Sequence, residues 1–262
     1  MRLKDCKMKG KTLFVSGGTR GIGKAIVYAF AKEGCNVAFT YASSADAANE
    51  IIADIESKYQ IKAKAYKLNI LEPDTYKDVY ELFDQDFDRL DFFISNAIIS
   101  GRAVVGGFGP FMRLKPKGLN NIYIATVDAF VVGAQEAAKR MEKVGGGSII
   151  SMSSTGNLVY TPNYAGHGTN KAAVETMVRY AAAELGEKGI RVNAVSGGPI
   201  DTDALKAFPN YEEVKSEVVR RSPLSRMGEA EDLTGACVFL CSDASSWMTG
   251  QTVVIDGGTT FQ

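Results

Sequence analysis

Glycines are clustered between Val15 and Lys24 in a pattern that suits phosphate binding. The stretch reads Ser16-Gly-Gly-Thr-Arg-Gly-Ile-Gly23 and stands between a short apolar run and an amphipathic one. Glycine lets the chain turn sharply and lets phosphate approach the backbone, and the first turn of a helix offers N–H groups and a positive dipole end. Because the cluster lies between the first strand and the first helix that we expect, we predict a nucleotide-binding site here.

A tyrosine, a histidine and a lysine recur along one predicted helix, at 164–188. Tyr164 stands seven residues before Lys171, and His167, the only histidine, stands four residues before it. Seven residues make nearly two helical turns, so Tyr164 and Lys171 share a face and lie about 10 Å apart along the axis. Geometry alone therefore admits either Tyr164 or His167 as a proton donor.

A regular alternation of strands and helices must position these residues. Runs of β-branched or aromatic residues bounded by Gly, Asn or charge predict strands at 12–16, 36–40, 63–68, 91–95, 148–152, 191–195 and 252–255. Amphipathic stretches predict helices near 21–33, 44–58, 72–88, 119–142, 164–188 and 229–242. This order predicts an α/β fold: a single doubly wound, Rossmann-type domain whose seven-stranded parallel sheet carries helices on both faces.

We expect one domain over residues 1–262, with a cofactor-binding half at about 1–152 and the catalytic helix and a substrate lid at about 153–262. Ligands of such sheets bind beyond the carboxyl ends of the strands, where two long connections lie. We interpret 201–222 as a lid. The glycine-rich connection 100–117 fits a lid and an ordinary surface excursion equally well.

Composition excludes several classes of protein. The 262 residues are 45% hydrophobic and 23% charged, with 30 basic and 30 acidic side chains. This balance argues against disorder and against nucleic acid as a partner. No stretch is apolar enough to span a bilayer, so we expect a cytoplasmic protein without membrane contact. The cysteines at 6, 35, 237 and 241 form no metal-ligand pattern, so we predict no metal site.

Several motifs occur in the order found in short-chain dehydrogenases/reductases, which this sequence resembles over nearly its whole length. Besides the glycine cluster, these motifs are Ser95-Asn96-Ala97, Ser153-Ser154, the tyrosine and lysine above, Asn193-Ala194-Val195 and Asp256-Gly257-Gly258. The resemblance implies that a nicotinamide dinucleotide contacts Gly17, Thr19, Arg20, Gly21, Ile22, Gly23, Tyr41, Ser43, Asn69, Ile70, Asn96, Ala97, Lys171, Ile200 and Thr202.

The end of the second strand indicates which dinucleotide is used. NAD-dependent enzymes of this fold place a carboxylate there to hold the ribose 2′-hydroxyl. The chain reads Thr40-Tyr41-Ala42-Ser43-Ser44, with no acid before Asp46. Arg20 in the glycine turn and the hydroxyls of Tyr41 and Ser43 suit a 2′-phosphate, so we predict NADPH.

The spacing of Tyr164 and Lys171 resembles one branch of the family, the enoyl-acyl-carrier-protein reductases. Ketone reductases of the family place the tyrosine four residues before the lysine, where this chain has His167, and their relay asparagine falls at about Thr126. The run 192–205 and Gln135-Glu-Ala-Ala-Lys139 are similar to the type III bacterial enzymes. The resemblance implies Tyr164 and Lys171 as catalytic residues, with Ser154 as an accessory donor or a plain loop serine.

We therefore expect NADPH-dependent reduction of a trans-2-enoyl thioester, carried on acyl carrier protein in bacterial fatty acid synthesis. The alternative in the same family is a carbonyl reductase acting on a 3-oxoacyl thioester, a sugar or a steroid. A nucleotide-binding sensor without turnover is the alternative outside enzymes. The resemblance also implies a homotetramer or homodimer packed through the helices at 119–142 and 164–188.

Overall fold

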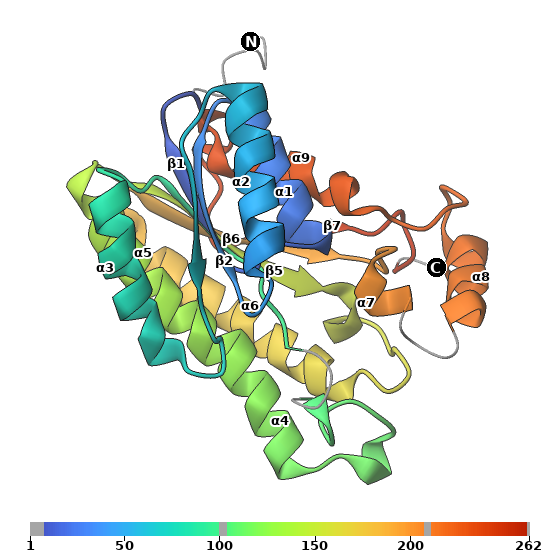
Figure 1. Ribbon diagram of the computed structural model, residues 1–262. Helices are drawn as coiled ribbons and strands as arrows, with labels where there is room; N and C mark the ends of the chain where they lie inside the picture. Colours follow the sequence, from blue (N-terminus) through green and yellow to red (C-terminus); the bar gives the residue numbers. More distant parts are fainter. Residues whose placement is uncertain (1–7, 100–103, 207–210, 261–262) are drawn as a thin grey trace.

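The protein is described by a computed structural model over residues 8–99, 104–206 and 211–260. The seven predicted strands are all present: β1 (Thr12–Val15), β2 (Asn36–Tyr41), β3 (Ala63–Lys67), β4 (Phe92–Ser95), β5 (Gly147–Ser154), β6 (Ile190–Gly197) and β7 (Thr252–Ile255). They form one parallel sheet in the order β3-β2-β1-β4-β5-β6-β7 (Figure 1). The order reverses between β1 and β4, which is where a doubly wound sheet binds its ligand.

Helices cover both faces of the sheet, as predicted. On one face lie α1 (Gly21–Lys32), α2 (Ala45–Tyr59) and α9 (Ala230–Cys241). On the other lie α3 (Tyr76–Asp86), α5 (Ala129–Lys143) and α6 (Ala165–Leu185). Apolar side chains of each strand alternate between the two layers: Leu13 and Val15 face the first and Phe14 faces the second. The fold is thus a three-layer α/β sandwich with a core on each side of the sheet.

The predicted helix at 119–142 is longer than expected and is not uniform. It begins as α4 (Pro116–Tyr123), passes through a π-helical segment, η4 (Ile124–Asp128), and continues as α5. The proline at the first position of α4 fits there because the first N–H groups of a helix have no partner within it. Thr126, which stands where carbonyl reductases carry the relay asparagine, lies in the π-helical segment, a type of helix that is frequent at functional sites.

The predicted lid contains two helices that the sequence analysis did not anticipate, α7 (Asp203–Lys206) and α8 (Tyr211–Arg221). The Tyr211 hydroxyl donates to Asp201 Oδ1 over 2.9 Å, and Arg221 Nη2 donates to the carbonyl oxygen of Thr259 over 3.1 Å. Both contacts attach α8 to segments at the carboxyl edge of the sheet. Residues 207–210 of this connection, residues 100–103 of the other one and Cys6 lie outside the described residues. The role of 201–222 as a lid stays a prediction.

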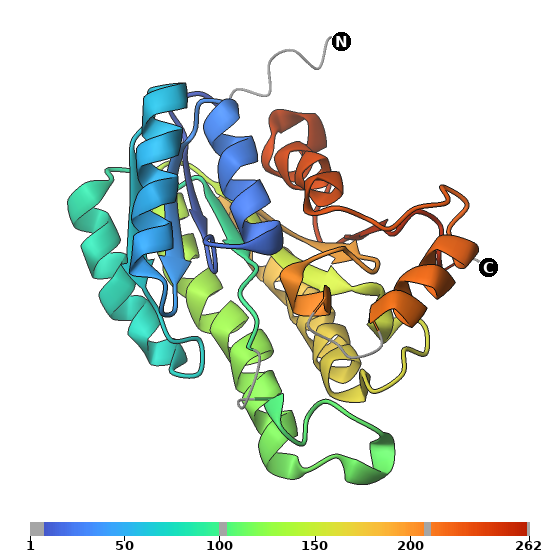
Figure 2. The ribbon, with the colours of Figure 1, turned by 45° about the vertical axis from the view of Figure 1, so that its right-hand side comes forward.

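The segment before α4 projects below the sheet and lies beside the beginning of α6 (Figure 2). It contains a short 3₁₀ turn, η3 (Phe111–Arg113). Other 3₁₀ turns are η1 (Pro73–Thr75), η5 (Thr155–Asn157), η6 (Gly186–Lys188) and η7 (Asp243–Ser245).

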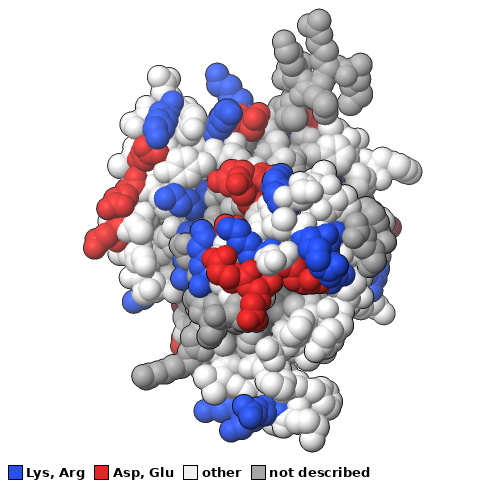
Figure 3. All heavy atoms as spheres, turned by 90° about the vertical axis from the view of Figure 1, so that its right-hand side faces the viewer, with Lys and Arg blue, Asp and Glu red and all other residues white. Residues whose placement is uncertain are grey.

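Figure 3 shows acidic and basic side chains intermixed over the centre of one face of the molecule.

Candidate active site

Loops at the carboxyl ends of β1, β2 and β4 are joined by hydrogen bonds at the switch point of the sheet. Asn96 Nδ2 donates to the carbonyl oxygens of Ser16 and Gly17, each over 3.0 Å. The Ser16 hydroxyl accepts from the backbone N–H groups of Asn96 and Ala97 over 3.0 and 3.1 Å. From β2, Thr40 Oγ1 accepts from Gly17 N over 3.0 Å. The glycine turn is therefore held from two sides.

Gly23 lies in the first turn of α1, against the glycine turn itself. A Cβ at this position would overlap the carbonyl oxygen of Gly17 and would lie 2.5 Å from Asn96 Nδ2. The capping residue of α1 is Arg20, and no side chain caps the first N–H groups of the helix. Closely packed backbone and uncapped N–H groups together fit a bound pyrophosphate, so the turn suits a dinucleotide.

The predicted cofactor residues after β2 and β3 are placed differently from one another. Ser43 after β2 is exposed, as Arg20 is in the glycine turn after β1, and Tyr41, the last residue of β2, is half-buried. Asn69 instead caps its own turn: Nδ2 donates to Glu72 Oε1 over 2.8 Å, and Oδ1 accepts from Leu71 N over 3.1 Å. The side chain of Ile70 packs into the core. Contacts of Asn69 and Ile70 with a cofactor stay predictions.

The segment after β6 returns toward the glycine turn. Ile200 is buried and forms a β-bridge with Gly228, and Asp201 N donates to the carbonyl oxygen of Gly228 over 2.7 Å. A Cβ built at Gly21 would lie 3.7 Å from Thr202 Cγ2. Thr202 therefore faces Gly21, so the structure brings together predicted cofactor residues from the loops after β1 and β6.

Tyr164 is the capping residue of α6, directly before its first helical residue; the predicted helix began at Tyr164 itself. Its ring lies against the backbone of Gly156, where an added Cβ would be 2.5 Å from Tyr164 Cε1. Burial raises the pKa of the phenol, and a hydrogen bond with Ser154 acts in the opposite direction. The phenol therefore stays protonated at neutral pH and, with Ser154, presents two hydroxyls at the end of β5.

Lys171 is buried on α6 and reaches the end of β5. Its Nζ donates to the carbonyl oxygen of Met152 over 2.6 Å. One turn later, the buried Glu175 accepts a hydrogen bond from the hydroxyl of Ser153. Burial lowers the pKa of Lys171 to about 8, and the charge of Glu175 opposes that shift. At neutral pH the lysine is therefore mostly protonated, in a site with little water to screen its charge.

His167 is stacked on Tyr164, with the ring centroids 5.3 Å apart and the planes at 25°. It is 9% exposed. Burial lowers the pKa of His167 to about 4, and the positive charge of Lys171 adds to the shift. The imidazole is therefore neutral at pH 7, which makes it a weak acid for protonating a substrate.

The low pKa of His167 predicts a loss of stability in acid. The unfolded chain takes up a proton on this residue near pH 6.5, whereas the folded chain takes it up only near pH 4. Stability should therefore fall between these two pH values by about 3 kcal/mol from this residue. Denaturant unfolding at several pH values between about 4 and 7 measures this slope. His167→Phe keeps the ring stack without titrating and should flatten it; equal slopes would contradict this account.

Three contributors to this site escaped the sequence analysis. Thr40 carries no motif, although it holds the glycine turn. Glu175 has a visible signal, since it stands one helical turn after Lys171 on the same face. Phe108, which contacts Tyr164 and His167, comes from the connection 100–117, whose unusual glycine content was the available signal.

The described residues include neither a metal-binding cluster nor a membrane-spanning helix. Within 8–99, 104–206 and 211–260, no group of three or more His, Cys, Asp or Glu side chains is placed to hold a metal ion. In the same part of the chain, no helix has the length and apolar character needed to cross a membrane. Cys35, Cys237 and Cys241 are buried free thiols.

Comparisons with known proteins identify the family. A profile described as Enoyl-(Acyl carrier protein) reductase matches residues 17–260. The chain is 36% identical over 249 residues to the 1-cyclohexenylcarbonyl-CoA reductase of Streptomyces collinus, covering 93% of this chain and 85% of that protein. It is 32% identical over 248 residues to a 3-oxoacyl-acyl-carrier-protein reductase of Staphylococcus aureus, covering 95% and 97%.

A solved structure supports the same family assignment. A 7α-hydroxysteroid dehydrogenase in complex with NADH and 7-oxo glycochenodeoxycholic acid has a TM-score of 0.89 and 31% identity, covering 98% of this chain and 97% of the other. Members of this family use a nicotinamide dinucleotide. With this fold, glycine turn and lysine-bearing helix, the chain belongs to the short-chain dehydrogenase/reductase family of oxidoreductases.

Proposed function

We propose that this protein reduces the α,β double bond of a 2-enoyl thioester, with NADPH as the hydride donor and acyl carrier protein as the expected carrier. The observation that supports this proposal is the Tyr164–Ser154 pair at the entrance to α6, combined with a neutral, buried His167 four residues before Lys171. The position that bears the acid in ordinary carbonyl reductases of the family thus holds a group with little acidity. The 1-cyclohexenylcarbonyl-CoA of the Streptomyces relative is, by its name, an α,β-unsaturated thioester.

Bound NADPH would supply a hydride to the β-carbon, and the electron pair of the double bond would move toward the thioester oxygen. The enolate would then take up a proton from water at the α-carbon, which gives the saturated thioester. Tyr164 donates a hydrogen bond to the thioester oxygen through its protonated phenol. A preorganised donor in a site with little water is usually the largest electrostatic contribution to such a step. Lys171, fixed by Met152 and charged at neutral pH, stabilises negative charge in its surroundings. It is the residue that would hold the ribose of a bound cofactor.

A second candidate is reduction of a 3-oxoacyl thioester. The relatives favour it more broadly than they favour enoyl reduction on acyl carrier protein, because 3-oxoacyl-acyl-carrier-protein reductases match 95% of the chain and 97% of their own length. In this case Tyr164 would protonate the 3-oxo group. Its position seven residues before Lys171, with His167 between them, is the feature that disfavours this reaction.

One assay separates the two candidates. The purified protein is mixed with NADPH and either a trans-2-enoyl thioester or the 3-oxoacyl thioester of the same chain length. Each is offered on coenzyme A and on acyl carrier protein, and oxidation is followed by the absorbance of the reduced nicotinamide. We expect turnover of the enoyl substrate. Turnover of the 3-oxo substrate alone would assign the protein to the carbonyl reductases, and turnover of neither would contradict both candidates.

We propose NADPH as the preferred cofactor because Arg20 is exposed in the glycine turn and the end of β2 carries no carboxylate. A charge-assisted hydrogen bond contributes about 1.5–3 kcal/mol, so Arg20→Ala should reduce the preference for NADPH over NADH at least about tenfold. The ratio of kcat/KM for the two cofactors measures it. Lys32→Ala, which removes a charge from the far end of α1, is the control and should leave the ratio unchanged. Equal use of both cofactors by the unmodified protein would contradict the assignment.

We also propose a homotetramer or homodimer that associates through α4–α5 and α6. Large side chains are exposed on these helices, among them Tyr123 on α4 and Met177 and Tyr180 on α6, with Tyr180 65% exposed. Apolar surface of this kind is typical of faces that are covered in an assembly.

A further inference from the structure

The glycine-rich segment before α4 is docked on the beginning of the catalytic helix. Gly109 N donates to the carbonyl oxygen of Asn163 over 2.9 Å, and Lys115 N donates to that of Gly106 over 2.7 Å, which closes the segment on itself. A Cβ at Gly166 of α6 would overlap the carbonyl oxygen of Gly107. The segment can therefore lie this close to α6 only because position 166 has no side chain.

This docking brings Phe108 to the side chains of the site. The Phe108 ring meets that of Tyr164 edge-on, with centroids 6.0 Å apart and planes at 85°. It meets His167 in the same way, at 5.7 Å and 70°. Since Tyr164 and His167 are themselves stacked, the three rings form a cluster in the geometry that aromatic pairs prefer.

The cluster restricts the Tyr164 ring from several directions. The backbone of Gly156 lies against the ring, His167 stacks on it, and Phe108 closes the edge. The phenol hydroxyl remains beside Ser154. A ring held in this way has little freedom to rotate, so its hydroxyl is fixed relative to the end of β5.

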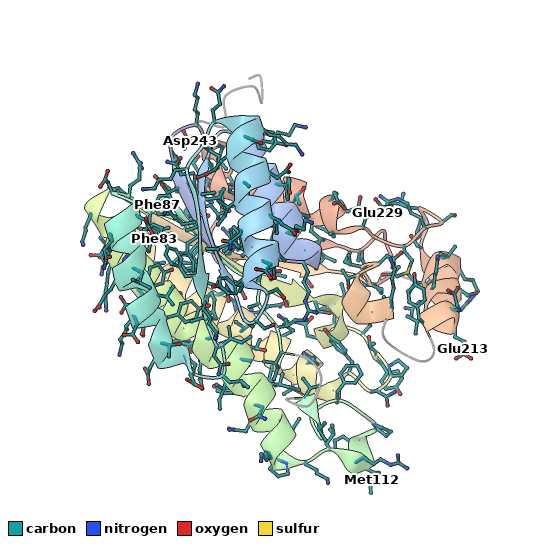
Figure 4. The ribbon with its side chains drawn as sticks, viewed as in Figure 1. Phe83, Phe87, Met112, Glu213, Glu229 and Asp243 are labelled. Carbon is teal, nitrogen blue, oxygen red and sulfur yellow. The ribbon has the colours of Figure 1, made fainter. Side chains whose placement is uncertain are left out.

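Phe108 differs in this respect from its neighbours in the segment. Phe111 is 80% exposed, and Met112, 91% exposed, lies at the outer tip of the projection (Figure 4). Both therefore point away from the catalytic helix, whereas Phe108 points toward it. The segment thus offers an internal comparison between an inward and an outward phenylalanine.

We propose that Phe108 is a positioning residue for the Tyr164 phenol: through ring contacts made across the docked segment, it holds the donor hydroxyl where the substrate oxygen must meet it. This proposal rests on the proposed function in one respect only, namely that the Tyr164 hydroxyl donates to the thioester oxygen of the substrate. The physical claim, that Phe108 fixes the Tyr164 ring, is independent of the substrate.

Phe108→Ala should lower kcat for the enoyl thioester about tenfold and leave the KM for NADPH unchanged, because the ring contacts with Tyr164 and with its stacking partner His167 are lost while the cofactor turn is untouched. Phe108→Tyr keeps the ring and should restore kcat to within about twofold of the parent. Phe111→Ala removes an equally large side chain from the same segment and should leave kcat unchanged. A Phe108→Ala variant with the kcat of the parent would overturn the proposal.

A measurement without substrate separates this proposal from the proposed function. In protein labelled with fluorotyrosine, the Tyr164 resonance in the fluorine NMR spectrum is assigned by its absence in Tyr164→Phe. It should move in Phe108→Ala and stay in place in Phe111→Ala; an unmoved resonance in both overturns the proposal even if enoyl reduction is confirmed. If the parent reduces no enoyl thioester, the proposed function fails and this spectrum still decides the role of Phe108. Should Phe108→Ala not fold, Phe108→Leu, which keeps bulk without a ring, takes its place in both measurements.

Discussion

Replacing Tyr164 by phenylalanine is expected to lower kcat for enoyl thioester reduction by about 10²–10³, the usual cost of losing one oxyanion donor. The ring remains, so its contacts with His167 and Phe108 and the packing against Gly156 persist. KM for NADPH should therefore change little, because the loss is confined to a hydroxyl that meets the substrate oxygen. Steady-state kinetics with each substrate varied in turn measure both constants.

The matched comparison is His167→Phe, which keeps the stack and removes the imidazole. Since burial lowers the pKa of His167 to about 4, its protonated form contributes almost nothing at pH 7, and the variant should lose less than about tenfold in kcat. The reverse ranking, with His167→Phe the more damaged variant, would make histidine the donor. If the unmodified protein also reduced ketones in preference to enoyl thioesters, the protein would be assigned to the carbonyl reductases instead.

Gly23→Ala is expected to weaken NADPH binding by about 5- to 150-fold, as overpacking by about 1–3 kcal/mol implies. The added methyl group would overlap the carbonyl oxygen of Gly17 and approach Asn96 Nδ2 to 2.5 Å. Neither group can move freely, because Asn96 is bonded to the carbonyl oxygens of both Ser16 and Gly17. Fluorescence titration with NADPH measures the affinity.

Gly235→Ala provides the control within the same molecule. It also adds a methyl group to a helical glycine, but in α9, where no atom outside the adjoining residues and the helix's own backbone lies within 4 Å of the new Cβ. Because alanine favours the helix by about 1 kcal/mol over glycine, this variant should bind NADPH normally and melt at the same or a higher temperature. Normal NADPH binding by Gly23→Ala would show that the turn is not packed as described.

Most of the fold was predictable because the strands inside the sheet, between the edge strands β3 and β7, are buried on both faces and read as short apolar runs. Phe14 illustrates this. It packs into one core layer while its neighbours Leu13 and Val15 pack into the other, so the strand is apolar on both faces. The segments that differed from prediction depend on contacts distant in sequence. Helix α8 carries only a narrow apolar stripe, Tyr211, Val214 and Val218, and none of its residues is buried. It is attached through Tyr211 and Arg221 to Asp201 and Thr259.

The candidate site was predictable only where spacing along one element carries the geometry. Tyr164 and His167 lie three residues apart, at the cap and in the first turn of α6, and their rings are stacked. That Tyr164 and Lys171 act on one substrate stays a prediction. Phe108 could not be placed in this way. Its ring reaches Tyr164 across 56 positions of the chain, through a backbone approach that depends on the absence of a side chain at residue 166.

The contact between Gly107 and Gly166 has a consequence for how this enzyme can have diverged from its relatives. While the projecting segment is present, any mutation at position 166 adds a side chain where the Gly107 carbonyl lies, so selection should keep that codon at glycine. In a relative with a shorter segment, no carbonyl oxygen lies against the helix at this position. The residue that corresponds to Gly166 can then carry a side chain. The length of one loop and the identity of one helix residue, nearly fifty positions further on, should therefore change together across the evolutionary tree.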